Sequence, residues 1–305
     1  MEQCHDESQT LDLDSYTYTP TELNLMDVNH KKKFTIVPLS AKNDNVEKFG
    51  IELECEFIDA TNRERKNIVD EIRGINDNQS FYCVSDGSLS DGVEIVSHPM
   101  TFNAIKRFDW NKILKFRGKV QSYNTSSCGI HVHINRDSMS ALNQYKFVQF
   151  INNQSTFAFY LSQRKVRRIN QWSSFKSMLG DELKRQLIYQ YKQDLDNDRE
   201  SLYKNVLIGD KYYATNLRHS KTIEIRIFRG TLNQRSFLKN IEFIKSVADW
   251  CKVSNTRNYL DFKSYWRFVL KSDKYSNLVN FCNDSESMQK AIQFPKMRIR
   301  DLNTI

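Results

Sequence analysis

No run of about 18 apolar residues, the length that a membrane-spanning helix needs, occurs in this 305-residue sequence. Residues 1–10 are polar and acidic, so the sequence indicates no signal peptide. Internal repeats and low-complexity tracts are absent as well. We therefore expect a cytoplasmic protein that has no membrane partner.

Closely spaced cysteine pairs are also missing. The six cysteines are scattered and form no CxxC motif, which argues against a zinc ribbon and against a dense disulfide framework. We expect them to be reduced thiols. They are Cys4, Cys55, Cys83, Cys128, Cys251 and Cys282.

The sequence has a modest excess of basic residues, with a formal net charge of +8. Such a charge is compatible with nucleic acid, which is not the favoured partner, and with an anionic substrate such as ATP. The basic residues form short clusters at 31–33, 164–168 and 296–300. Arg164, Arg167 and Arg168 either form a solvated helix face or contact a phosphate or an acidic peptide.

The chain divides into a polar leader and one larger domain. Residues 1–47 have few periodic apolar positions and predict a flexible leader with one short strand at 34–37. Residues 48–305 predict a single larger domain. Strand patterns dominate from 49 to 134, with a helix at 64–73 between them, and return at 212–215 and 222–228. A helical insertion at about 138–205, which Ser138 could cap, and a helical C-terminal part complete an α+β fold.

Strict alternation marks the segment 50–57, which reads GIELECEF. Successive side chains of a strand point to opposite faces, so Glu52, Glu54 and Glu56 should share one face. Neighbouring carboxylates in this row, roughly 7 Å apart, would repel by about 2 kcal/mol at an effective dielectric of about 20. A solvated charged face and a metal site both explain this pattern.

Two further segments alternate in the same way. Segment 130–134 places His131 and His133 on one face, and segment 222–229 does the same with Glu224 and Arg226. The histidines could simply be a semi-buried pair with satisfied hydrogen bonds, or they could bind zinc. Glu224 and Arg226 could simply form a surface ion pair. Together they suggest nucleotide chemistry, because carboxylates and imidazoles bind divalent cations and a guanidinium binds phosphate.

Four motifs then occur in a fixed order: GIELECE, DGSL followed by GVEIVSHP, CGIHVHIN, and TIEIRIFRGTLN. In this order they resemble the amidoligase family of the carboxylate–amine ligase superfamily, which includes glutamine synthetase and glutamate–cysteine ligase. The resemblance extends from Phe49 to Trp250. It implies a curved, largely antiparallel sheet that binds ATP and two or three Mg²⁺ ions. The long substrate loops of glutamine synthetase have no match, so ammonia and glutamate do not carry over as substrates.

The resemblance also implies the site residues. The expected metal ligands are Glu52, Glu54, Glu94, His131 and Glu224, with Asp86 and His133 as accessory candidates. His131 and His133 cannot be distinguished by position, because they share a face. Glu54 and Arg226 are expected to be catalytic, with Arg226 holding the transferred phosphoryl group. Asn216, by its position just before the strand of Glu224, is either a substrate or nucleotide contact or part of a turn.

The expected function is therefore an ATP-dependent ligase that joins a carboxylate to an amine through an acyl phosphate, with a peptide or protein among the candidate substrates. Two alternatives remain at this stage. One is a metal-dependent phosphodiesterase or nuclease, which clustered carboxylates and histidines would also suit. The other is an inactive nucleic-acid-binding or regulatory protein that has kept the fold.

Overall fold

The structure is a computed structural model that describes residues 46–75, 80–89, 91–175, 212–219 and 221–296. It also describes the backbone of two short strands, β1 (Leu25–Asp27) and β2 (Thr35–Val37), which pair antiparallel. The strand predicted at 34–37 corresponds to β2. The rest of the predicted leader up to residue 45 lies outside the described residues, as do the basic cluster at 31–33 and residues 297–300 of the cluster at 296–300.

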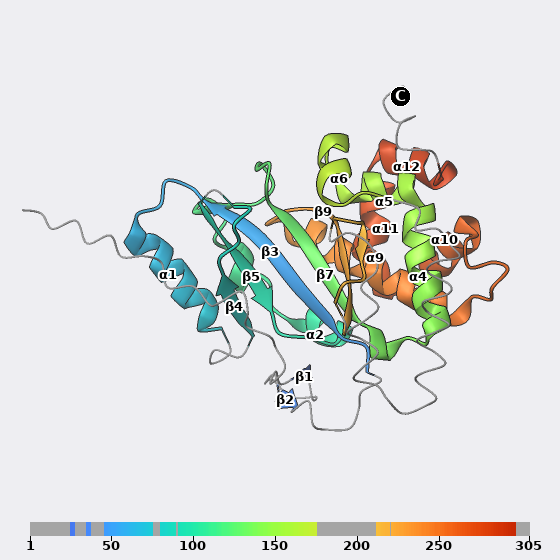
Figure 1. Ribbon diagram of the computed structural model, residues 1–305, viewed down its shortest axis with the longest axis horizontal. Helices are drawn as coiled ribbons and strands as arrows, with labels where there is room; N and C mark the ends of the chain where they lie inside the picture. Colours follow the sequence, from blue (N-terminus) through green and yellow to red (C-terminus); the bar gives the residue numbers. More distant parts are fainter. Residues whose placement is uncertain are drawn as a thin grey trace, which may run out of the picture.

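An antiparallel, open and curved sheet forms the centre of the molecule, with the strand order β4-β5-β3-β7-β9-β8 (Figure 1). A short strand, β6, pairs with the end of β3. The strands are β3 (Phe49–Phe57), β4 (Phe81–Val84), β5 (Gly92–Ser97), β6 (Val120–Gln121), β7 (Gly129–Asn135), β8 (Thr215–Asn216) and β9 (Thr222–Arg229). The antiparallel sheet that the sequence predicted is therefore present, although β8 is shorter than the strand predicted at 212–215 and begins where that strand was expected to end.

The helices fall into two groups along the chain. Those of the first half are α1 (Asn62–Arg73), α2 (Phe102–Arg107), α3 (Asn111–Leu114), α4 (Ala141–Asn153), α5 (Ser155–Ser162) and α6 (Val166–Trp172). Those of the second half are α9 (Gln234–Val253), α10 (Phe262–Leu270), α11 (Ser276–Asn283) and α12 (Glu286–Gln293). The predicted helical insertion is helical from α4 through α6, and residues 176–211 lie outside the described part. None of the described helices is both long and apolar enough to cross a membrane.

Local sequence signals explain where α1 and α4 begin. Thr61 and Glu64 form a reciprocal capping box at the start of α1, in which Thr61 Oγ1 accepts from the Glu64 amide at 3.3 Å. The cap of α4 is Ser140 rather than the predicted Ser138, because residues 136–138 form a separate 3₁₀ turn. The prediction for α1 is thus confirmed, and the start of α4 is shifted by two residues.

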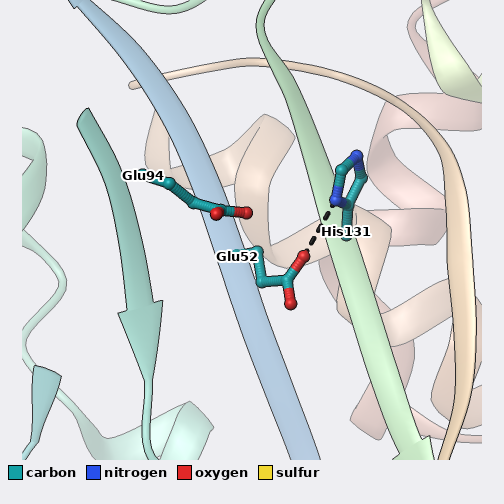
Figure 2. A group of neighbouring side chains, drawn as sticks. All are labelled: Glu52, Glu94 and His131. Atoms are coloured by element: carbon teal, nitrogen blue, oxygen red, sulfur yellow. Dashed lines mark hydrogen bonds and ion pairs between the residues drawn. The ribbon is translucent and has the colours of Figure 1, made fainter. Parts of the chain in front are cut away.

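Central strands β5, β3 and β7 lie side by side, and each presents polar side chains on the same face of the sheet. Figure 2 shows Glu94, Glu52 and His131 projecting from these three strands toward one another. Because side chains alternate along each strand, the opposite face of the same strands is apolar.

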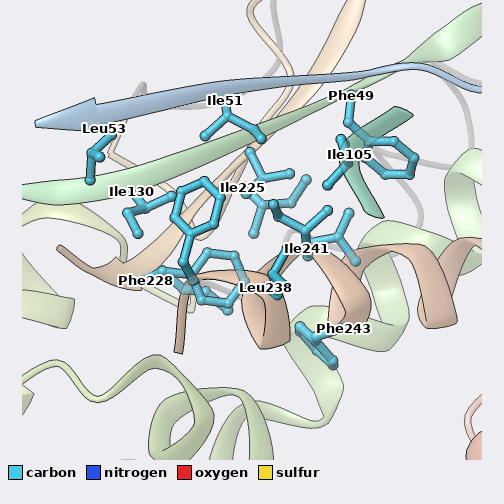
Figure 3. Close-up of a cluster of buried hydrophobic side chains, with 14 of the residues drawn as sticks. Phe49, Ile51, Leu53, Ile105, Ile130, Ile225, Phe228, Leu238, Ile241 and Phe243 are labelled. Atoms are coloured by element: carbon cyan, nitrogen blue, oxygen red, sulfur yellow. The ribbon is translucent and has the colours of Figure 1, made fainter. Parts of the chain in front are cut away.

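The hydrophobic core lies on that apolar face. Isoleucine and phenylalanine side chains of β3, β7 and β9 pack there against α9, as Figure 3 shows for Ile51, Ile130, Phe228 and Ile241. All four are at most 2 % exposed. Burial of each such side chain contributes about 1.5–3 kcal/mol, so the apolar face holds the strands in place and the polar face is positioned by them.

Candidate functional site

Strand register aligns the polar residues of β3 with those of its two neighbours. Glu52 lies directly opposite His131 of β7, and Glu54 lies opposite Glu94 of β5. His131 Nδ1 is 2.9 Å from Glu52 Oε2, and His131 Nε2 is 3.7 Å from Glu54 Oε1. The expected ligands from three separate motifs are thus brought together at the centre of the sheet.

The same alignment continues toward the sheet edge. His133 of β7 lies opposite Glu224 of β9, which in turn lies opposite Asn216 of β8. His133 Nε2 approaches Glu52 Oε1 to 2.9 Å, and Asn216 donates a hydrogen bond to Glu224 Oε2 at 2.6 Å. Both histidines therefore belong to the site. The side chain of Asn216 also accepts from the Arg218 amide at 2.9 Å, so its described contacts position Glu224.

Three overlapping groups of side chains could each hold a metal ion. Within each group the ligand atoms lie within 4.8 Å of one another. The groups are Glu52 with Glu94 and His131, Glu52 with His133 and Glu224, and Glu54 with Asp86 and Glu94. Every residue that the sequence analysis gave as a ligand or accessory ligand belongs to at least one group.

The electrostatics of Glu52 and Glu94 differ sharply. Burial acts to raise the pKa of Glu52, but the nearby His133 and His131 outweigh it and hold this pKa well below the usual value. Burial raises the pKa of Glu94 well above its usual value, and the charges of Glu52, Glu54 and Asp86 raise it further. Glu94 Oε1 is buried and has no hydrogen-bond partner in the described part of the chain.

An unpaired buried carboxylate oxygen surrounded by other carboxylates costs free energy unless a proton or a cation neutralises it. The ligand set is mostly carboxylate oxygen with two imidazoles, which suits hard divalent cations such as Mg²⁺. The residues present therefore fit a divalent metal ion.

Glu224 and Arg226 form a tight ion pair on the same face. Arg226 Nη1 donates to Glu224 Oε1, and Arg226 Nε is buried without a partner among the described residues. Burial acts to raise the pKa of Glu224, but the hydrogen bond from His219 and the charge of Arg226 lower it to about 2. A permanently charged guanidinium beside the carboxylates can receive a phosphate oxygen.

Sequence reasoning missed His219 as a member of this site and did not predict that Arg164 lies next to the carboxylates. His219 Nε2 lies 3.1 Å from Glu224 Oε2, and its ring centroid is 5.3 Å from that of His133. Arg164 packs beside Gly129, where a β-carbon would come within 1.8 Å of Arg164 Nη2 and 3.3 Å of Glu54 Oε2. His219 follows β8 in an irregular segment and had no periodic signal. The sequence analysis gave Arg164 as part of a solvated helix face or as a contact for a phosphate or an acidic peptide, and did not place it beside the carboxylates; it lies just before α6.

A bulge in β9 changes the position of Arg229. Ile130 pairs with Phe228 and Val132 pairs with Ile225, so β9 has one residue more than β7 over this interval. A regular strand would have placed Arg229 on the face opposite Glu224 and Arg226. With the bulge, Arg229 lies opposite Gly129 and shares the polar face.

The fold and the site together define an α+β protein with a buried group of carboxylates and histidines that suits divalent cations. Residues 75–248 match the family model described as "Putative amidoligase enzyme", and the chain belongs to this amidoligase family. Membership indicates a ligase-type enzyme. The match begins after β3, so Glu52 and Glu54 lie outside it and enter the site through strand pairing. No curated protein matches the chain significantly.

Proposed function

We propose that this protein is an ATP- and Mg²⁺-dependent ligase that forms an amide from a carboxylate and an amine. Its curved sheet would then correspond to that of glutamine synthetase and glutamate–cysteine ligase. The observation that carries the proposal is that ligand atoms of Glu52, Glu94 and His131 lie within 4.8 Å of one another. Two further groups of potential ligands each share Glu52 or Glu94 with this group. Family membership supports the ligase chemistry.

An amine does not displace oxygen from a carboxylate at neutral pH, because the carboxylate is anionic and oxide is a poor leaving group. In the proposed reaction the carboxylate oxygen attacks the γ-phosphorus of ATP, and ADP leaves. The amine nitrogen then attacks the carbonyl carbon of the acyl phosphate and loses a proton, and inorganic phosphate leaves with the former carboxylate oxygen. The products are the amide, ADP, phosphate and a proton.

The acidic residues and histidines of the site would bind the metal ions in this reaction. Glu52, Glu54, Glu94, His131 and Glu224 would hold two or three Mg²⁺ ions, with Asp86 and His133 as accessory ligands. Mg²⁺ supplies positive charge that neutralises the phosphates of ATP during transfer.

Arg226 would hold the phosphoryl group while its charge shifts between donor and acceptor. Its Nη1 is occupied by Glu224, but the unpaired Nε supports a further hydrogen bond to an oxyanion. Asn216 would act by fixing Glu224, or would contact the nucleotide if its present hydrogen bonds rearranged.

The test is a screen of carboxylate and amine pairs for ADP release. A ligase requires both substrates, whereas a phosphodiesterase or nuclease would cleave phosphate esters without any amine. Amine-independent phosphate hydrolysis would contradict the proposal, and so would a lack of Mg²⁺-ATP binding in calorimetry.

Arg226→Ala tests the assignment within the site. We expect single-turnover ADP formation to fall by about 100- to 1,000-fold while the affinity for Mg²⁺-ATP changes little, because an interaction made mainly in the transition state affects the rate more than binding. Arg226→Lys should also be impaired, since it lacks the guanidinium fork. The control is Arg235→Ala, which removes an exposed ion pair between α9 and Asp284 at the end of α11. If Arg226→Ala instead weakened nucleotide binding and left the chemical step unchanged, Arg226 would be a ground-state contact of the nucleotide and this assignment would be wrong.

A further inference from the structure

A basic pocket of about 470 Å³ lies beside the carboxylate site. The residues that line it comprise five cationic side chains and a short polar loop, and none of them is acidic. They are Arg164, Lys165, Arg167, Arg168, Arg229 and the loop 124–126. The volume falls within the range of about 300–1,000 Å³ that is usual for small-molecule sites.

Arg229 is held rigidly at the wall of this pocket. Its Nε donates to the Tyr123 carbonyl at 2.8 Å, and its guanidinium carbon lies 3.5 Å from the centre of the Tyr123 ring. The β9 bulge is what brings it to the polar face. Because the side chain is already fixed, little rotamer entropy is lost when it binds an anion.

Arg164 connects the pocket with the carboxylate site. Its Nε donates to the Phe228 carbonyl at 2.9 Å, while Nη2 lies against Gly129, close to Glu54 Oε2. Burial lowers the pKa of Arg164 to about 10, partly offset by the charge of Glu54, so the guanidinium stays charged at neutral pH. A ligand bound in the pocket would thus extend toward the proposed reaction centre.

Arg167 and Arg168 complete the positive charge. Arg167 is exposed and makes no ion pair with the described residues. The Arg168 guanidinium donates to the neutral side chain of Gln171 at 3.3 Å and makes no ion pair with the described residues either. Like charges at this density repel one another, so the pocket is more stable when an anion occupies it.

We propose that this pocket binds a second anionic group of the acid substrate, remote from the carboxyl group that reacts. The substrate would then be a di- or polycarboxylate. This inference rests on the proposed ligase function. The phosphates of ATP would lie with their Mg²⁺ ions at the carboxylates and histidines of the candidate metal groups, and the pocket lining contains neither residue type. Guanidinium groups bind a metal-free carboxylate directly through paired hydrogen bonds.

The experiment compares binding of glutarate, a dicarboxylate, with binding of butyrate, a monocarboxylate, by calorimetry in excess Mg²⁺. The pocket variant is Arg167→Ala with Arg168→Ala. The control is Arg63→Ala with Lys66→Ala, which removes the same charge from the exposed face of α1, at the other end of the molecule from α6 (Figure 1). If the pocket variant fails to fold, the single variant Arg167→Gln replaces it. Mg²⁺-ATP binding is measured for every protein.

We expect the wild type to bind glutarate at least about tenfold more tightly than butyrate, and the pocket variant to lose about tenfold in glutarate affinity. The control variant and all Mg²⁺-ATP affinities should be unchanged. Equal glutarate affinity in all three proteins, or none in the wild type, would overturn the inference.

A pocket variant that loses Mg²⁺-ATP binding but keeps glutarate binding would also overturn it, because the pocket would then hold the phosphate chain. Pocket-dependent glutarate binding without any Mg²⁺-ATP binding would support the pocket and reject the proposed ligase function, so the two failures are distinguishable.

Discussion

Replacing Glu94 with glutamine should stabilise the metal-free protein at neutral pH. Glu94 is 2 % exposed, its Oε1 has no partner among the described residues, and its ligand atoms lie within 4.8 Å of those of Glu52 and Glu54. At this distance and an effective dielectric of about 20, each pair of carboxylates repels by about 3.5 kcal/mol. His131, His133 and Arg226 offset part of this repulsion, so we expect a net gain of about 1–3 kcal/mol.

The effect should depend on pH with a defined sign. The folded-state pKa of Glu94 is raised, so the folded wild type binds this proton more tightly than the unfolded chain. The stabilisation that protonated Glu94 gives the wild type is fully present below about pH 4.3, the pKa of glutamate in the unfolded chain. It is lost as the pH rises through the folded-state pKa of Glu94, by about 1.4 kcal/mol per pH unit. The advantage of Glu94→Gln should therefore vanish near pH 4 and reach a plateau above the folded pKa.

Urea unfolding with a chelator present, from pH 4 to pH 8, measures this difference. The control is Glu56→Gln on the same strand face, because Glu56 belongs to none of the three groups and accepts a hydrogen bond from Ser127. Excess Mg²⁺-ATP should stabilise the wild type by about 2.7 kcal/mol at 100 times its dissociation constant, and the variant by less. A Glu94→Gln protein that is less stable than the wild type at pH 8 without metal would refute the reasoning, as would an advantage that does not change with pH.

Three further outcomes follow from the packing. Gly129→Ala should destabilise the protein by about 1–3 kcal/mol in urea unfolding, because the new β-carbon would displace Arg164. The control is Gly87→Ala, whose β-carbon would have no atom within 4 Å, so this variant should be neutral or slightly stabilising. Glu242→Ala should lower the free energy of unfolding in urea by about 3 kcal/mol, since this fully buried carboxylate accepts hydrogen bonds from Lys106, Asn277 and the Leu278 amide. The control Glu286→Ala removes an exposed ion pair with Lys290 and should change this free energy very little. In a Cys4→Ser background, a thiol reagent should react only after denaturation, because the five remaining cysteines are buried; fast labelling of the native protein would contradict this burial.

Much of the site was predictable from local pattern. The period of two along segments 50–57, 130–134 and 222–226 places each group of polar side chains on one face, because successive side chains of any strand alternate. The cap of α1 was equally local. The order of the motifs was sufficient to indicate the amidoligase family, which the match over residues 75–248 confirms.

Other features were decided only by the tertiary structure, because they depend on pairs of residues far apart in the chain. Which residue of β3 lies opposite which residue of β7 is set by register, and register is set by packing of the apolar face. The proximity of His219 and Arg164 to the carboxylates depends on irregular segments that have no periodicity. The extra residue in β9 reverses the alternation, so Arg229 turns to the face opposite the one that its sequence position predicts.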